Sequence, residues 1–182
     1  MNPDASPRIW TAANVLTALR LILTFPVTYA ILNEPFGPAS PALLLFLVAA
    51  CTDSLDGIVA RARGEITKLG TLLDPIADKI FGSVTFGALA LGGYLPWALL
   101  VALVVKELAL LIGGAFLLRR RGLVISARSL GKLATFVMSV GFGVIVGGFE
   151  DVGARIATTG VVLSLAAGVD YALQVVRGRA TG

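Results

Sequence analysis

The chain has 182 residues, of which 57% are hydrophobic and 14% are charged, and its formal net charge is +4. So apolar a composition excludes an ordinary soluble domain and indicates a membrane protein. Because the chain has no histidine and one cysteine, it lacks the commonest general base and cannot form an intrachain disulfide, so acid–base or metal chemistry must use carboxylates.

The apolar stretches predict an all-α integral membrane protein that forms a single domain over residues 1–182. A membrane-spanning helix needs about 20 mostly apolar residues, and the second stretch reaches that length only if its helix continues through the acidic segment that follows. A short interfacial segment, with Trp10 at headgroup depth, is expected before the first span. The six expected transmembrane helices cover residues 14–32, 41–61, 69–91, 96–118, 129–148 and 154–176.

Lysine and arginine predict the orientation of these spans, because they gather at cytoplasmic ends. Both chain ends and the connections after the second and fourth spans are basic, whereas the other connections carry Glu34, Glu150 and Asp151, with Arg155 as the basic exception. Both termini are therefore predicted to be cytoplasmic, in a multi-pass protein of the cell (inner) membrane. Nucleic-acid binding is not expected, because the basic residues lie beside apolar spans without interleaved aromatic residues.

Glycines recur in the later spans, for example at Gly141 and Gly143. Membrane helices favour small residues where they pack closely together. We therefore interpret these glycines as packing residues rather than as part of a chemical site.

Four aspartates interrupt the apolar pattern within the second and third expected spans: Asp53, Asp56, Asp74 and Asp78. Residues three or four apart share one face of a helix, so each pair presents its carboxylates together. Two converging pairs would repel one another unless cations joined them. An all-oxygen ligand set favours Mg²⁺ or Mn²⁺. The alternative, buried ion pairs among Asp53, Asp56, Asp78 and Arg61, explains neither the small residues nearby nor the all-acid pairing.

The residues around the aspartates suit a phosphorylated ligand. Gly57 and Ala60 leave one helix face bare enough for a bulky ligand to approach the backbone. Arg61 follows at the cytoplasmic end, where a guanidinium can pair with phosphate, and Gly70 permits close packing where the third span begins. Together these residues predict a diphosphate or a nucleotide held between metal ions and arginine.

The pattern Asp53-x2-Asp56-Gly57-x2-Ala60-Arg61-x8-Gly70-x3-Asp74-x3-Asp78 resembles, at every fixed position, the signature of the CDP-alcohol phosphotransferases. The resemblance implies two Mg²⁺ or Mn²⁺ ions held by the four aspartates, in a site that faces the cytoplasm. It also implies a homodimer, and Asp78 as the catalytic base for the acceptor hydroxyl. The residues that it implies for CDP binding are Asp53, Asp56, Gly57, Ala60, Arg61 and Gly70.

Two further stretches resemble one branch of this family, the phosphatidylglycerophosphate synthases and eukaryotic-type cardiolipin synthases. They are "NVLTALR" at residues 14–20 and "LDPIADK" at residues 73–79. The alternative explanation of the first stretch is a polar helix start in which Arg20 snorkels toward water.

Basic residues in or near the later spans help to predict which alcohol is the acceptor. Lys106, Arg128 and Lys132 are candidates to bind the phosphate of glycerol 3-phosphate, although positive-inside topology also explains basic residues in a cytoplasmic connection. Residues 131–135 read Gly-Lys-Leu-Ala-Thr, whereas the glycerophosphate branch often has Gly-Lys-x-Lys-Thr. The missing second lysine keeps phosphatidylglycerol open as a rival acceptor.

Together with these residues, the resemblance implies an enzyme of phospholipid biosynthesis. It would transfer a phosphatidyl group from CDP-diacylglycerol to a small alcohol phosphate, glycerol 3-phosphate, and release CMP among membrane lipids. A cardiolipin synthase that uses phosphatidylglycerol is the rival within this class. From other classes, the alternatives are a cation transporter with a four-aspartate site and a non-catalytic scaffold; transporters usually place such sites near the midplane, often at broken helices.

Overall fold

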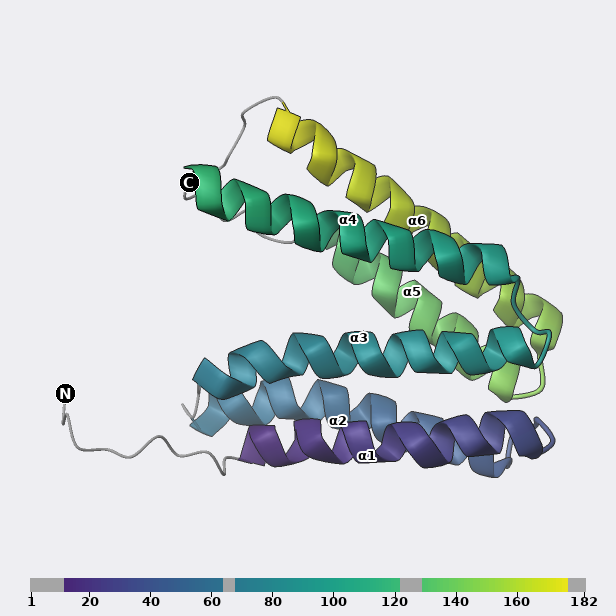
Figure 1. The fold of residues 1–182 in the computed structure, drawn as a ribbon. Coiled ribbons are helices and arrows are strands. Elements are labelled where there is room, and N and C mark those ends of the chain that lie inside the picture. Colours follow the sequence, from purple (N-terminus) through teal and green to yellow (C-terminus); the bar gives the residue numbers. More distant parts are fainter. Residues whose placement is uncertain (1–11, 64–67, 122–128, 177–182) are drawn as a thin grey trace. The chain divides into compact units, whose positions relative to one another are not determined.

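The computed structural model describes the backbone of residues 12–63, 68–121 and 129–176, and the side chains of residues 15–52, 76–113 and 130–174. This part of the chain is helical apart from short turns and contains no strand, which confirms the all-α prediction (Figure 1). The helices are α1 (Ala12–Asn33), α2 (Pro41–Arg63), α3 (Lys68–Leu91), α4 (Trp97–Arg121), α5 (Ser129–Val146) and α6 (Glu150–Val176). The expected interfacial segment with Trp10 lies outside the described residues.

Each of the six expected spans coincides with one helix, and the largest difference is at α6. This helix begins at Glu150 rather than at residue 154, because Glu150 and Asp151 in its first turn favour the positive end of the helix dipole. The preceding helix, α5, ends at Val146, and Gly148 then adopts a φ of 94°. Glycine permits this left-handed conformation, which turns the chain into α6.

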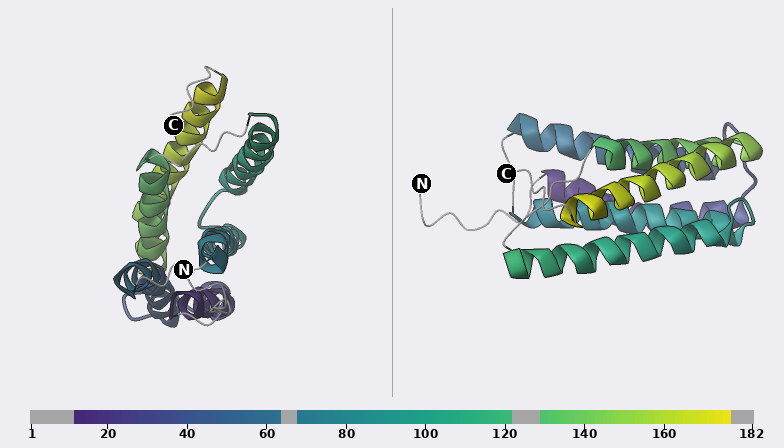
Figure 2. Two further views of the ribbon diagram at one scale, coloured as in Figure 1. Left: turned by 90° about the vertical axis from the view of Figure 1, so that its left-hand side faces the viewer. Right: turned by 90° about the horizontal axis from the view of Figure 1, so that it is seen from above.

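The chain forms two compact units, Met1–Gly92 and Gly93–Gly182. In the first unit, α1 packs against both α2 and α3, and Figure 2 shows α1 between them. In the second unit, α6 packs extensively against α5 and also contacts α4. The single domain over residues 1–182 stays a prediction.

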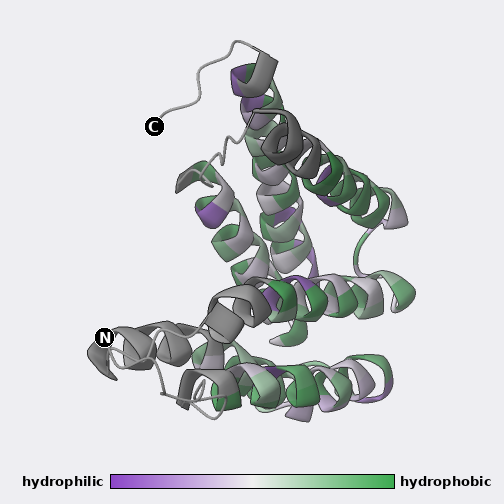
Figure 3. Ribbon diagram, turned by 60° about the vertical axis from the view of Figure 1, so that its left-hand side comes forward, coloured by the Kyte–Doolittle hydropathy of each residue, from purple (hydrophilic) through white to green (hydrophobic). Residues whose placement is uncertain are grey.

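Helix α1 carries large apolar side chains on its exposed face and polar ones on the buried face of its first half. Thr17, Arg20 and Thr24 are buried there, whereas the buried residues of the second half are the apolar Val27, Ala30 and Ile31. A buried polar stretch opposite an exposed apolar face is the reverse of what an amphipathic helix in a soluble bundle shows. Figure 3 shows that apolar residues occur along much of each described helix. The large side chains on the exposed face of α1 follow helical spacing: Val15, Leu19, Ile22, Phe25, Tyr29 and Leu32.

Among the described residues, two stretches are long and apolar enough to cross a membrane, Val15–Asn33 in α1 and Glu150–Gln174 in α6. Shorter apolar stretches occur in α2 and α5, at Pro41–Thr52 and Leu130–Val146. An outward apolar face of this kind marks contact with lipid or with another protein.

Glycines bring α5 and α6 into close contact, as predicted for Gly141. A Cβ atom at Gly141 would lie 2.4 Å from the backbone nitrogen of Ala157. A Cβ at Gly160 would similarly lie 2.6 Å from the backbone nitrogen of Met138. The two backbones therefore approach more closely than any residue with a side chain would allow at these points.

Replacing Gly141 with alanine is expected to lower the Tm of the protein in detergent. The added methyl group meets backbone rather than a movable side chain, and overpacking of this kind costs about 1–3 kcal/mol. Gly131→Ala is the matched control on the same helix, because nothing lies within 4 Å of its added Cβ. Since alanine favours a helix over glycine, the control should keep or raise the Tm. A wild-type Tm for Gly141→Ala would contradict the close packing of α5 on α6.

Candidate active site

The two aspartate pairs lie on consecutive helices, as the sequence predicts. Asp53 and Asp56 are in the second half of α2, and Asp74 and Asp78 are in the first half of α3. The side chains of Asp53, Asp56 and Asp74 lie outside the described residues. Among the side chains that are described, no three histidine, cysteine or acidic groups gather, and the convergence of the four aspartates stays a prediction.

The residues expected to bind CDP occupy the adjoining ends of the same two helices. Gly57, Ala60 and Arg61 lie in the last turns of α2, and Gly70 lies in the first turn of α3. Their surroundings lie outside the described side chains, as does the whole of Arg128. Their roles therefore stay predictions.

Asp78 forms an ion pair with Arg20 of α1, which the sequence did not predict. The Nη1 atom of Arg20 donates to Oδ1 of Asp78. The Arg20 side chain is only 1% exposed, whereas that of Asp78 is 49% exposed. The snorkelling interpretation of Arg20 is therefore wrong, because its guanidinium lies inside the first unit and holds a carboxylate that solvent can reach.

Two threonines of α1 form hydrogen bonds along the helix itself. Thr24 Oγ1 donates to the carbonyl oxygen of Arg20 over 3.0 Å, and Thr28 Oγ1 donates to that of Thr24 over 2.7 Å. Hydroxyls at these positions commonly bond the carbonyl four residues earlier. The charged Arg20 cannot be satisfied in that way, so it depends on an acidic group from another helix.

Lys106 is held by polar groups within the second unit. Its Nζ atom donates to Ser164 Oγ of α6 over 2.7 Å and lies 2.6 Å from Oε1 of Glu107. The aliphatic stem packs against Gly168, where a Cβ atom would lie 3.0 Å from Lys106 Cγ. Lys132 lies exposed in the first turns of α5. The structure thus fixes the place of Lys106 in its unit, and binding of an acceptor by either lysine stays a prediction.

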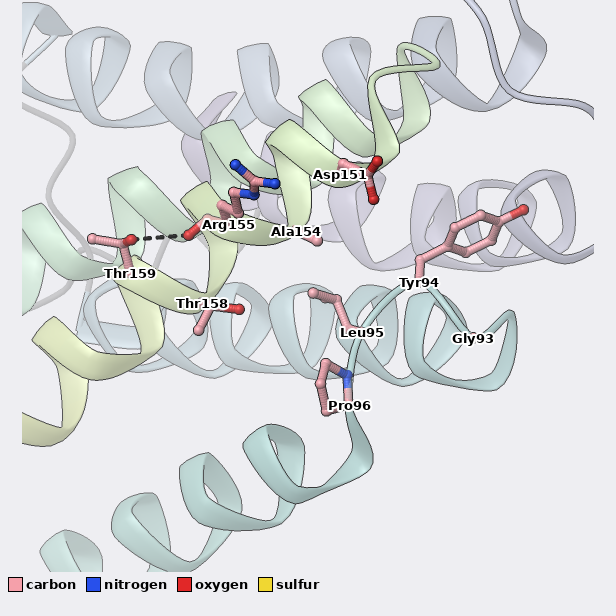
Figure 4. Close-up of a pocket in the computed structure, with 9 residues that line it drawn as sticks. All are labelled: Gly93, Tyr94, Leu95, Pro96, Asp151, Ala154, Arg155, Thr158 and Thr159. Atoms are coloured by element: carbon pink, nitrogen blue, oxygen red, sulfur yellow. Dashed lines mark hydrogen bonds between the residues drawn. The ribbon is translucent and has the colours of Figure 1, made fainter.

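A separate pocket of about 670 Å³ lies where α4 and α6 begin (Figure 4). Its polar side chains include Tyr94, Asp151 and Arg155, and the turn before α4, residues 93–96, forms another wall. No residue of the aspartate motif lines it. Because α5 and α6 run in opposite directions, the pocket is at the end of the second unit opposite to Lys132.

The donor groups of the motif fit divalent cations such as Mg²⁺ or Mn²⁺. All four are carboxylates, which hard cations prefer. The one that the structure describes, Asp78, has half of its side chain exposed and is therefore open to an ion or a ligand.

Comparison with known proteins agrees with the motif. A family model described as CDP-alcohol phosphatidyltransferase matches residues 10–169. A Mycobacterium tuberculosis protein named "Probable phosphatidylglycerophosphate synthase" is 36% identical over 179 aligned residues, which cover 93% of this chain and 84% of that protein.

Two other relatives carry different names. A Mycoplasma genitalium protein named "CDP-diacylglycerol--glycerol-3-phosphate 3-phosphatidyltransferase" is 34% identical over 146 residues, covering 71% of this chain and 61% of that protein. A Streptomyces coelicolor protein named "Cardiolipin synthase (CMP-forming)" is 34% identical over 182 residues, covering 93% of this chain and 85% of that protein. Because the family model matches most of this chain, the chain belongs to the CDP-alcohol phosphatidyltransferase family.

Proposed function

We propose that this protein transfers a phosphatidyl group from CDP-diacylglycerol to glycerol 3-phosphate, forming phosphatidylglycerophosphate and CMP. The observation that carries the proposal is the complete aspartate motif on α2 and α3, in a chain that belongs to a family of such transferases. Two relatives support the acceptor, because their names specify phosphatidylglycerophosphate synthesis or transfer to glycerol 3-phosphate.

In the proposed reaction, a hydroxyl oxygen of glycerol 3-phosphate attacks the phosphorus that carries diacylglycerol. A new phosphorus–oxygen bond forms, and the bond between that phosphorus and the bridging oxygen of CMP breaks. Asp78 accepts the hydroxyl proton, a role that requires only hydrogen-bond reach at the moment of transfer. The half-exposed carboxylate of Asp78 is accessible enough for this role.

The remaining motif residues bind the donor. Two Mg²⁺ or Mn²⁺ ions, held by Asp53, Asp56, Asp74 and Asp78, would neutralise the diphosphate charge and polarise the phosphorus. Arg61 pairs with a phosphate of CDP, because a guanidinium matches phosphate geometry. Gly57 and Ala60 let the nucleotide approach the backbone of α2.

The six helices are proposed to span the cell membrane with both termini and the active site on the cytoplasmic side. The outward apolar face of α1 supports this placement, as do the two stretches of spanning length and the basic residues at one set of helix ends. CDP-diacylglycerol would enter from the lipid and glycerol 3-phosphate from the cytoplasm. The homodimer stays a prediction, which cross-linking in native membranes would test.

Phosphatidylglycerol is the second candidate acceptor, and it would make the protein a cardiolipin synthase. The absence of a second lysine at residues 131–135 favours this alternative, as does the name of the Streptomyces coelicolor relative. Both acceptors require the same donor and the same aspartate chemistry, so only the acceptor distinguishes them.

CMP release by the purified protein in detergent tests the proposal. CDP-diacylglycerol and Mg²⁺ would be combined with one acceptor at a time: glycerol 3-phosphate, phosphatidylglycerol, serine or inositol phosphate. We expect CMP only with glycerol 3-phosphate. Activity with one of the other three alone would refute the proposed acceptor, and metal flux into liposomes without any CMP release would instead support a cation transporter.

Replacing Lys106 with methionine is expected to raise the KM for glycerol 3-phosphate by about 10- to 100-fold, because a hydrogen bond to a charged group contributes about 1.5–3 kcal/mol. Methionine keeps the apolar stem that packs on Gly168. The KM for CDP-diacylglycerol should stay near the wild-type value in the same steady-state assay.

Ser164→Ala is the matched control, because it removes the hydrogen bond to Lys106 Nζ and leaves the cation in place. This variant should keep the KM for glycerol 3-phosphate within about threefold of wild type. If Lys106→Met and Ser164→Ala lower the Tm alike and leave both KM values unchanged, Lys106 is a packing residue only.

A further inference from the structure

Arg20 stands out as a buried charge in the first unit that the aspartate motif does not include. It is 1% exposed and lies on α1, the helix that packs against both aspartate-bearing helices. A buried guanidinium requires an anionic partner, because its desolvation is otherwise too costly. Arg20 meets this requirement with Asp78 of α3.

Arg20 lies at the same depth in the first unit as the aspartates. It is 8 residues from the start of α1, Asp56 is 7 residues from the end of α2, and Asp78 is 10 residues from the start of α3. These three helix ends lie at the same end of the unit (Figure 1). At 1.5 Å per residue, all three positions are about 10–15 Å from that end.

The ion pair is asymmetric, since the arginine is buried and the aspartate is half exposed. Here the guanidinium binds the carboxylate from inside the unit, and the outward part of the carboxylate stays accessible. The planar fork of a guanidinium fixes the orientation of a bound carboxylate better than an ammonium group does.

We propose that Arg20 is a positioning residue that orients the Asp78 carboxylate toward the metal ions and the acceptor hydroxyl. The proposal rests on the proposed function, in which Asp78 binds metal and accepts the proton. Outer partners of metal ligands commonly change metal affinity or activity by about 10- to 100-fold when they are removed. Arg20 is expected to act in this way, without touching substrate itself.

Mn²⁺ binding in a double-mutant cycle tests Arg20 independently of catalysis. The proteins are wild type, Arg20→Gln, Asp78→Asn and the double variant, and free Mn²⁺ is measured by electron paramagnetic resonance in detergent. We expect Arg20→Gln to weaken Mn²⁺ binding by about 10- to 100-fold. The double variant should bind no more weakly than Asp78→Asn alone, because Arg20 acts through Asp78.

The rate of CMP release in the same proteins gives the second readout. Arg20→Gln should lower kcat by about 10- to 100-fold, with a KM for CDP-diacylglycerol within about threefold of wild type. Arg155→Gln, which removes an exposed arginine of α6, is the control and should match wild type in both readouts. If Arg20→Gln weakens Mn²⁺ binding as expected but the wild-type protein releases no CMP, the proposed function fails, whereas the positioning of the Asp78 carboxylate toward metal by Arg20 stands.

Arg20→Lys is the second variant, to be used if Arg20→Gln does not fold. It retains the positive charge but lacks the planar guanidinium group that fixes the orientation of the carboxylate. It should bind Mn²⁺ more weakly than wild type and more tightly than Asp78→Asn. Wild-type Mn²⁺ affinity in both Arg20 variants, with a lower Tm only, would overturn the proposal and leave Arg20 as a structural link between α1 and α3. Additive losses in the double variant would overturn it as well.

Discussion

Asp78→Asn is expected to lower kcat for CMP release by about 10²- to 10⁴-fold, the usual contribution of a general base. Asparagine has nearly the same shape and can still accept a hydrogen bond from Arg20, so the pairing of α1 with α3 should persist. It cannot take up the proton of the acceptor hydroxyl, and it is a weaker ligand for a divalent cation. Steady-state CMP release with saturating CDP-diacylglycerol and glycerol 3-phosphate measures the loss.

The control for this variant is Asp151→Asn, which removes an exposed aspartate from the first turn of α6. It should retain wild-type kcat and KM values. Asp78→Asn with a kcat within about threefold of wild type would remove Asp78 from the reaction and would favour a non-catalytic role for the motif.

Chelation of divalent cations should abolish CMP release, because four carboxylates cannot hold a diphosphate without cations to balance their charge. We expect EDTA to lower the rate by more than about 10³-fold, in line with the several kcal/mol that metal ions contribute to transition-state charge stabilisation. Adding Mg²⁺ or Mn²⁺ in excess of the chelator should restore the rate.

The control for chelation is the Tm of the protein in EDTA. If EDTA unfolded the protein, activity would be lost for that reason alone, and added metal would find no folded protein to reactivate. Folded protein that keeps its full rate in EDTA, after dialysis against metal-free buffer, would contradict a two-metal site. The same result would also contradict the role of the four aspartates on α2 and α3 as metal ligands.

The helices could be predicted from the sequence because apolar runs dominate this chain. The prediction was least accurate at the start of α6, where Glu150 and Asp151 interrupt the apolar pattern but favour a helix N-terminus. Hydropathy therefore placed the start too late, whereas capping chemistry would have placed it correctly. The packing at Gly141 was predictable because small residues mark close helix contacts.

The candidate site was predictable in its chemistry but not in all of its contacts. Spacing placed each aspartate pair on one helix, and the helices confirm that placement. The ion pair of Arg20 with Asp78 joins residues 58 positions apart, and a single sequence does not specify such a contact. A signal was nevertheless present, because a lone arginine within an apolar helix has to find a partner.

Lys106 was singled out from the sequence, but its contacts do not distinguish a binding role from a structural one. Its place in an apolar run predicted a functional cation, and the structure shows that Ser164 and Glu107 already contact it. Such contacts serve equally to hold a binding group in place or to satisfy a buried charge. The distinction depends on the KM for glycerol 3-phosphate in Lys106→Met.

Transfer of isotope-labelled glycerol 3-phosphate into lipid tests the central claim most directly. Purified protein would be incubated with CDP-diacylglycerol, Mg²⁺ and labelled glycerol 3-phosphate, and the lipid product identified by mass spectrometry alongside CMP. The proposed function predicts labelled phosphatidylglycerophosphate and CMP in equal amounts, and Asp78→Asn should form both products at least about 10²-fold more slowly. CMP formed without label in the lipid, or labelled lipid formed equally well by Asp78→Asn, would contradict it.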